Sequence, residues 1–382
     1  MPDILFHVPT RVVFGVDTIT RIGQIAAEYG ERAFLVTEAI LYESKVVQRI
    51  QDILDKRGTQ YIVFDEVVPN GTTATVDNGV TLARGSHADV VIGLGGMRAL
   101  STAKCIAMTV PTENDMDDYL SGVQPQGEPL PYIEVPTTCR DHFLLTEEWL
   151  ITDGRDRTGK MGRAQKGITK AVVMDPKLCN ALPAKYTATS MMDTLLAAVE
   201  GFLSTRGNFL TDTWFLKAIE ILGRSLGEAM QNPDDVKTRT NASMAGLLTG
   251  LGLSMSRTGI GTALAYAMNA RFMVPKSWVS TILLPQVMEY AISARGERIA
   301  QLGRFLGEST EGLPTVEAAT KTVDAVRRLI SSLNLPTRLR EFDLSLDEMI
   351  EIAGTARSYD MMNYLPRAAA IEDLYEMIKA AF

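Results

Sequence analysis

Histidine and cysteine are scarce in this chain, and their scarcity limits the chemistry that it can perform. Three residues of each type occur among 382. The cysteines lie far apart and form no CxxC pair, so neither a zinc knuckle nor a disulfide framework is indicated. Unpaired thiols are typical of a reducing cytoplasm, which is the location that we expect. A site built on three imidazoles would need all of His7, His87 and His142.

Long hydrophobic runs and a surplus of positive charge are missing as well. No apolar run approaches the roughly 18 residues that a membrane span needs. The N-terminus shows no basic segment followed by an apolar one, so we expect no signal peptide. Lys and Arg total 38 against 46 Asp and Glu, a net charge of −8. Because binding to nucleic acid needs a basic face, we expect no nucleic acid as a partner. Because no apolar run is long enough to span a bilayer, we expect no membrane as a partner either.

The sequence changes character near its middle. Apolar β-branched runs occur at residues 11–14, 33–37, 61–64, 90–93 and 132–135. Helix-patterned stretches lie between them at residues 18–29, 46–57, 73–87 and 100–108. This alternation predicts a parallel sheet covered by helices, whereas the sequence after about Pro183 is patterned almost entirely as helix. We therefore expect a Rossmann-like α/β domain over residues 1–181, an all-helical domain over residues 182–382, and a small-molecule substrate in the cleft between them.

A glycine-rich turn follows the predicted strand at residues 90–93. Gly93-Leu94-Gly95-Gly96 leads directly into a helix-patterned stretch. Glycine lets the backbone approach a ligand closely, and a helix N-terminus presents unpaired N–H groups to an anion. The turn therefore predicts an anion-binding site, with an ordinary tight turn as the alternative.

Several motifs occur in the order found in the iron-containing (group III) alcohol dehydrogenases, which the chain resembles over nearly its whole length. The matching segments are Val12-Val13-Phe14-Gly15 for the first hairpin of that family, Pro69-Asn70 for its PNPT segment, Gly93-Leu94-Gly95-Gly96 and Ala103-Lys104 for the ends of its GxGGGSxxDxAK motif, Pro136-Thr137-Thr138 for the start of PTTAGTGSE, residues 193–200 for DALxHAxE, and Leu283-Leu284-Pro285 with residues 363–367 for two late landmarks. The resemblance implies a dehydroquinate synthase-like architecture, in which a nucleotide-binding domain precedes a helical one. It also implies NAD- or NADP-dependent interconversion of alcohols and aldehydes, with a divalent metal, often iron, held by one Asp and two or three His.

The positions that the resemblance assigns to metal ligands have lost their imidazoles. Asp193 is retained, but the histidine positions carry Ala197, Thr262, Tyr266 and Lys276. A single carboxylate rarely holds a first-row metal, and a charged lysine cannot be a ligand. We therefore expect no tightly bound iron or zinc. We expect instead that the Lys276 ammonium pairs with Asp193 in the former metal cavity, the alternative being that both groups are hydrated.

The segments that the resemblance places around the cofactor also depart from the family. Met97, Arg98 and Ser101 replace the third Gly, the Ser and the Asp of the first motif, and residues 139–144 replace AGTGSE with bulkier and charged side chains. The expected cofactor contacts are Glu38, Asn70, Gly95, Gly96, Met97, Arg98, Thr137, Thr138 and Arg140.

Charge distinguishes the two nicotinamide cofactors. Glu38 would accept the ribose hydroxyls of NAD and repel the 2′-phosphate of NADP, so NAD is favoured. Arg98 and Arg140 would hold a phosphate or carboxylate, unless they are simply solvated loop residues.

Without a metal, hydride transfer needs another group at the carbonyl oxygen. The catalytic candidates are Lys276 with its partner Asp193, His142 as a general acid–base, and Tyr266 as a proton donor, against the plainer readings of a loop histidine and a half-buried helix tyrosine. Three functions stay open: a metal-independent oxidoreductase, a non-catalytic subunit or scaffold of an active relative, and an enzyme that acts on an anionic substrate without net redox. The family also implies a homo-oligomer.

Overall fold

The computed structural model describes residues 3–67, 71–139, 142–181, 183–232 and 234–382. The chain divides into two compact units, Met1–Ala181 and Leu182–Phe382. Two of the predicted cofactor contacts, Asn70 and Arg140, lie outside the described residues. No helix in the described ranges combines the length and the apolar character needed to cross a bilayer.

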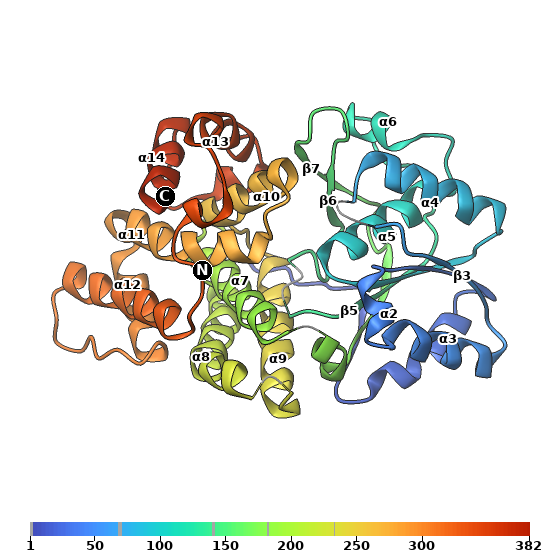
Figure 1. Cartoon of the computed structure of the whole chain (residues 1–382), viewed down its shortest axis with the longest axis horizontal. Helices are drawn as coiled ribbons and strands as arrows, with labels where there is room; N and C mark the ends of the chain where they lie inside the picture. Colours follow the sequence, from blue (N-terminus) through green and yellow to red (C-terminus); the bar gives the residue numbers. More distant parts are fainter. Residues whose placement is uncertain (1–2, 68–70, 140–141, 182, 233) are drawn as a thin grey trace. The chain divides into compact units, whose positions relative to one another are not determined.

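A six-stranded sheet forms the centre of the first unit (Figure 1). Its strands run in the order β1-β8-β5-β4-β2-β3, and every neighbouring pair is parallel. Their bounds are β1 (Arg11–Phe14), β2 (Arg32–Val36), β3 (Gln60–Phe64), β4 (Val90–Gly95), β5 (Tyr132–Pro136) and β8 (Thr169–Met174). Gly95 pairs with Pro136, and Val36 with Gly93, so β2, β4 and β5 end side by side. Parallel sheets bind ligands at this edge.

The side chains of each strand alternate between two hydrophobic layers. In β2, Phe34 and Val36 belong to one core and Ala33 and Leu35 to the other, as a period of two residues requires. The first layer packs against α4 (Thr73–Gly85), α5 (Met97–Thr109) and α6 (Met116–Leu120). The second packs against α1 (Ile22–Ala27), α2 (Ile40–Glu43) and α3 (Val46–Arg57), and Figure 1 shows the two helix sets on opposite sides of the sheet.

Three features of this unit differ from the sequence-based expectations. The segment at 12–15 is not one arm of a hairpin, because β1 pairs in parallel with β8. The predicted helix at 18–29 is a 3-10 turn, Thr18–Arg21, followed by the short α1. An antiparallel hairpin of β6 (Glu148–Thr152) and β7 (Gly159–Arg163) was not predicted. Its second strand, GKMGR, carries neither β-branched residues nor a clear polar–apolar alternation.

The second unit consists of helices packed around α7. The helices are α7 (Ala184–Leu203), α8 (Phe209–Gln231), α9 (Val236–Leu253), α10 (Ile260–Phe272), α11 (Lys276–Leu302), α12 (Thr315–Ser332), α13 (Met349–Arg357) and α14 (Ile371–Ala381). α7 is buried from Thr187 to Leu203 and contacts α8, α9, α10 and α11. The longest of these helices, α11, is interrupted by the non-helical backbone of Arg295. Because α7 is buried from Thr187 to Leu203, its polar side chains need hydrogen-bond partners on neighbouring elements.

Candidate functional site

The glycine turn of the first unit joins β4 to α5. Gly95 ends the strand with φ +148°, and Gly96 is the N-cap of α5. Thr137, directly after β5, donates its backbone N–H to the Gly95 carbonyl at 2.9 Å. A Cβ on Gly95 would lie 2.8 Å from the Cβ of Ala99, so both the conformation and the close packing require glycine.

Polar groups from two other strand ends border this turn. The Glu38 carboxylate, two residues after β2, comes within 3.6 Å of the Cβ position on Gly95. The Thr138 methyl lies 3.9 Å from the Cβ position on Gly96, and the buried Thr138 hydroxyl makes no hydrogen bond to any described residue. The structure thus brings together five predicted cofactor contacts, which are Glu38, Gly95, Gly96, Thr137 and Thr138. A helix N-terminus, an unsatisfied hydroxyl and a carboxylate fit the phosphates and ribose of a dinucleotide.

The remaining described candidates of this unit are more enclosed than the sequence suggests. Met97 is buried at the start of α5, and Arg98 beside it is partly buried. His142 is only 4% exposed, so it is buried rather than on an open loop.

In the second unit, three helices bring together the positions that the family uses for metal ligands. Asp193 and Ala197 lie one turn apart on α7, Thr262 and Tyr266 lie one turn apart on α10, and Lys276 is the first residue of α11. Lys276 Nζ lies 2.5 Å from Asp193 Oδ1, with the two side chains 3% and 0% exposed. The predicted ion pair is therefore confirmed. Nζ also lies 4.9 Å from the centre of the Tyr266 ring, within the range of a cation–π contact.

Local contacts fix the start of α11 where Lys276 must point inward. Asn269 near the end of α10 donates its side-chain amide to the Val274 carbonyl at 2.7 Å. Ser277, next to Lys276, donates its hydroxyl to Thr189 on α7 at 3.2 Å. The turn between α10 and α11 and the first residues of α11 are thereby held against the helix that carries Asp193.

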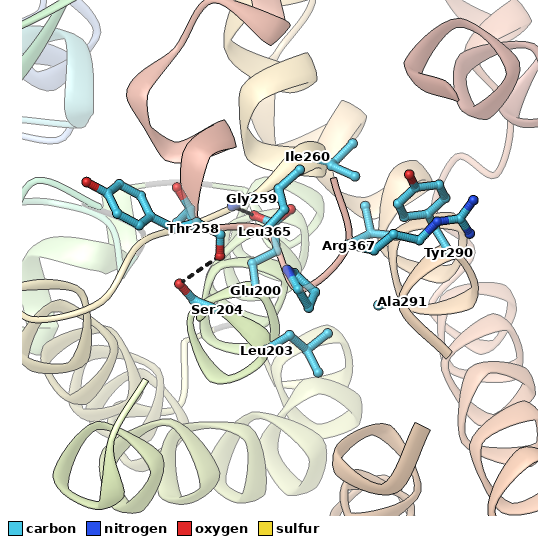
Figure 2. Close-up of a pocket in the computed structure, with 13 residues that line it drawn as sticks. Glu200, Leu203, Ser204, Thr258, Gly259, Ile260, Tyr290, Ala291, Leu365 and Arg367 are labelled. Atoms are coloured by element: carbon cyan, nitrogen blue, oxygen red, sulfur yellow. Dashed lines mark hydrogen bonds between the residues drawn. The ribbon is translucent and has the colours of Figure 1, made fainter. Parts of the chain in front are cut away.

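Glu200, one of the residues at the end of the DALxHAxE-like segment, binds the N-terminus of α10 (Figure 2). Its carboxylate accepts the backbone N–H of Gly259 at 2.9 Å, the N–H of Gly261 at 2.6 Å and the Thr262 hydroxyl at 2.7 Å. Burial raises the pKa of Glu200, and these hydrogen bonds oppose the rise without cancelling it. No local pattern indicated a role for Glu200, because only the fold shows that it meets α10. The Thr262 hydroxyl therefore uses its hydrogen to bind Glu200.

The cavity drawn in Figure 2 lies beside Glu200 and is bordered by Leu203, Ile260 and Leu365. Its free volume is about 20 Å³, which is room for roughly one water molecule. This cavity is therefore too small to bind a substrate in the described conformation.

The five positions do not fit a divalent metal ion. They supply one carboxylate that is already paired with an ammonium, an alanine, a hydroxyl bonded to Glu200, a tyrosine and the lysine itself. Within the described ranges, no group of three or more His, Cys, Asp or Glu side chains is arranged to hold a metal. The cation that this arrangement holds is its own lysine side chain.

Both units match models of one protein family. Residues 9–176 match the model for iron-containing alcohol dehydrogenase, and residues 187–382 match the model for the C-terminal part of the Fe-containing alcohol dehydrogenase family. The 1,3-propanediol dehydrogenase of Citrobacter freundii is 28% identical over 99% of this chain and 98% of its own length. The NAD-dependent methanol dehydrogenase of Bacillus methanolicus is 24% identical over 98% of this chain and 99% of its own.

A comparison with solved structures also finds a protein of similar fold. The crystal structure of a 1,3-propanediol oxidoreductase superimposes with a TM-score of 0.94 at 26% identity and covers 100% of both chains. The two family models together account for nearly the whole sequence. The chain therefore belongs to the iron-containing alcohol dehydrogenase family and is an alcohol dehydrogenase-like oxidoreductase.

Proposed function

We propose that this protein interconverts an alcohol and its aldehyde or ketone with NAD(H), and that it does so without a divalent metal ion. The observation that carries the proposal is the buried contact between Lys276 and Asp193 at positions where the family holds its metal. A cation is still supplied there, but it is covalently part of the chain. General decay of the site would not be expected to produce a well-formed ion pair.

The glycine turn supports NAD as the cofactor. Gly96 is the N-cap of α5, so the turn offers the N–H groups of a helix N-terminus to a phosphate, and the buried Thr138 hydroxyl is an unused polar group beside it. Glu38 places a negative charge next to the turn, which disfavours the additional phosphate of NADP. One relative, the methanol dehydrogenase of Bacillus methanolicus, is named as NAD-dependent.

In the proposed reaction, the Lys276 ammonium is the electrophilic group that interacts with the carbonyl oxygen of the substrate. NADH, when bound, supplies a hydride to the carbonyl carbon, and the carbonyl oxygen must gain a proton to become the alcohol. The Lys276 ammonium would stabilise the developing negative charge on that oxygen and provide the proton. Asp193 orients the ammonium, and the Tyr266 ring contacts it as well. His142 and Tyr266 remain alternative proton donors.

The test is NADH oxidation with a panel of aldehydes and ketones, measured after extensive treatment with a chelator. We expect turnover that is equal with and without the chelator, and a decrease of about 10²–10⁴-fold in kcat for Lys276→Met, which is the usual contribution of a general acid. The matched control is Lys379→Met, because Lys379 forms an exposed ion pair with Glu376 on α14.

Two results would contradict the proposal. Activity that disappears with the chelator and returns with Fe²⁺ or Zn²⁺ would show that a metal performs the chemistry. Absence of both turnover and NADH binding, together with co-purification of a histidine-complete relative, would instead favour the non-catalytic subunit.

A further inference from the structure

Lys104, in the middle of α5, is a buried lysine for which the proposed reaction has no use. Lys104 is only 1% exposed, and its Nζ atom lies within hydrogen-bond distance of three backbone carbonyls. It donates to the carbonyls of Phe143 at 3.2 Å, Thr146 at 2.9 Å and Glu148 at 3.1 Å. A lysine ammonium has three N–H groups, so these acceptors are as many as it can serve. All three belong to one segment, residues 143–148.

This segment contains a strained turn. Leu145, between two of the accepting carbonyls, has φ +65°, a left-handed conformation that non-glycine residues rarely adopt. Within the turn, Thr146 donates both its N–H and its hydroxyl to the Phe143 carbonyl, at 3.1 and 2.9 Å. Such strain persists only where the surroundings over-determine the backbone. Lys104 provides that restraint from outside the turn.

The clamp connects α5 to a segment that lies close to Thr138 in the sequence. α5, which carries Lys104, has Gly96 of the glycine turn as its N-cap, and the clamped segment begins five residues after Thr138, which borders the turn. A second contact strengthens the connection, because Ser101 on α5 accepts the backbone N–H of Leu150 at 3.3 Å. Movement of residues 143–150 away from α5 would therefore break four hydrogen bonds, three to Lys104 and one to Ser101.

We propose that Lys104 is a positioning residue that locks residues 143–148 onto α5, the helix that follows the glycine turn, and so positions the N-terminus of α5 for the nucleotide. The inference rests on the proposed function where it concerns the nucleotide. The clamp itself is a property of the first unit and can be measured without any ligand.

The first measurement is hydrogen exchange of the backbone amides in the segment. Lys104→Met keeps the length and burial of the side chain but removes the donors. We expect exchange over residues 144–148 to accelerate about tenfold or more, since several charge-assisted hydrogen bonds are lost. Exchange in the strands β4 and β5 should change little. Cys105→Ala, at the neighbouring buried position on α5, is the matched control and should leave the segment protected.

The second measurement is NADH binding by fluorescence titration together with steady-state kinetics. In Lys104→Met we expect the Kd and KM for NADH to rise about tenfold, while kcat at saturating NADH changes much less. Lys104→Gln, which keeps two N–H donors, should give intermediate values in both measurements. If Lys104→Met does not fold, the Gln variant and the protection of residues 144–148 in the wild type carry the test.

Clear results overturn the inference. Wild-type exchange in the segment of a folded Lys104→Met protein would show that Lys104 does not hold it, as would rapid exchange of the same amides in the wild type. Accelerated exchange with an unchanged Kd for NADH would refute the positioning role and leave only a structural one. A wild-type protein that binds no NADH would refute the proposed function, and the exchange data would still decide the clamp.

Discussion

Removing the Lys276 ammonium should strongly destabilise the helical unit. Lys276→Met leaves the Asp193 carboxylate fully buried without the cation that it contacts at 2.5 Å. Breaking a buried ion pair by removing one partner costs about 3–5 kcal/mol of unfolding free energy. For a unit of this size, each kcal/mol of unfolding free energy corresponds to about 2–4 °C in the thermal unfolding midpoint. That midpoint should therefore fall by roughly 6–20 °C. Asp193→Leu should cost a comparable amount, because it removes the carboxylate that the buried ammonium contacts.

The double variant distinguishes an ion pair from two unrelated buried groups. Replacing both partners with apolar side chains removes both buried charges, and such replacements are often neutral or stabilising. We therefore expect Lys276→Met with Asp193→Leu to lie within about 2 kcal/mol of the wild type, far from the sum of the single effects.

Urea denaturation followed by circular dichroism measures the four members of this cycle. Lys379→Met serves as the control, since it breaks an exposed lysine–carboxylate contact and should leave the midpoint unchanged. Two results would refute the reasoning. One is a Lys276→Met protein as stable as the control variant, and the other is a double variant in which the two losses simply add.

Three further predictions concern other contacts. Glu38→Ala should improve binding of NADPH relative to NADH by about tenfold or more, because it removes a like charge beside the turn; titration of both nucleotides measures this, and an unchanged ratio would contradict it. Gly95→Ala should lower the unfolding free energy by about 1–3 kcal/mol, since φ is +148° and the new methyl would lie 2.8 Å from Ala99; an unchanged melting curve would count against the described turn. Burial raises the pKa of Glu200 above its usual 4.5, so the folded state holds that proton more tightly than the unfolded state. Its stabilising contribution is complete below pH 4.5 and is lost as pH rises through the raised pKa, and Glu200→Gln should flatten this part of the stability–pH curve; an unaltered slope would refute the assignment.

The sequence predicted those parts of the molecule that depend on local patterns. Alternating strands and helices indicated the parallel sheet, and a strand followed by Gly93-Leu94-Gly95-Gly96 indicated the turn into α5. The contact between Lys276 and Asp193 could be predicted because two positions of a known motif order carried opposite charges at sites that the fold brings together.

The parts that were missed depend on contacts between distant residues. Lys104 was matched to the end of a family motif, but nothing local shows that its amine meets carbonyls about 40 positions away. Glu200 reaches the start of α10 across about 60 positions. The β6–β7 hairpin lacks the side-chain alternation that marks a strand. In each case the tertiary partner, rather than the local sequence, determines the role of the residue.

The central claim is that the Lys276 ammonium takes the place of a divalent ion. Calorimetric titration of the chelator-treated protein with Zn²⁺ and with Fe²⁺ tests it most directly. We predict no stoichiometric binding of either ion to the wild type. Binding of one ion per chain that disappears in Asp193→Ala would contradict the claim.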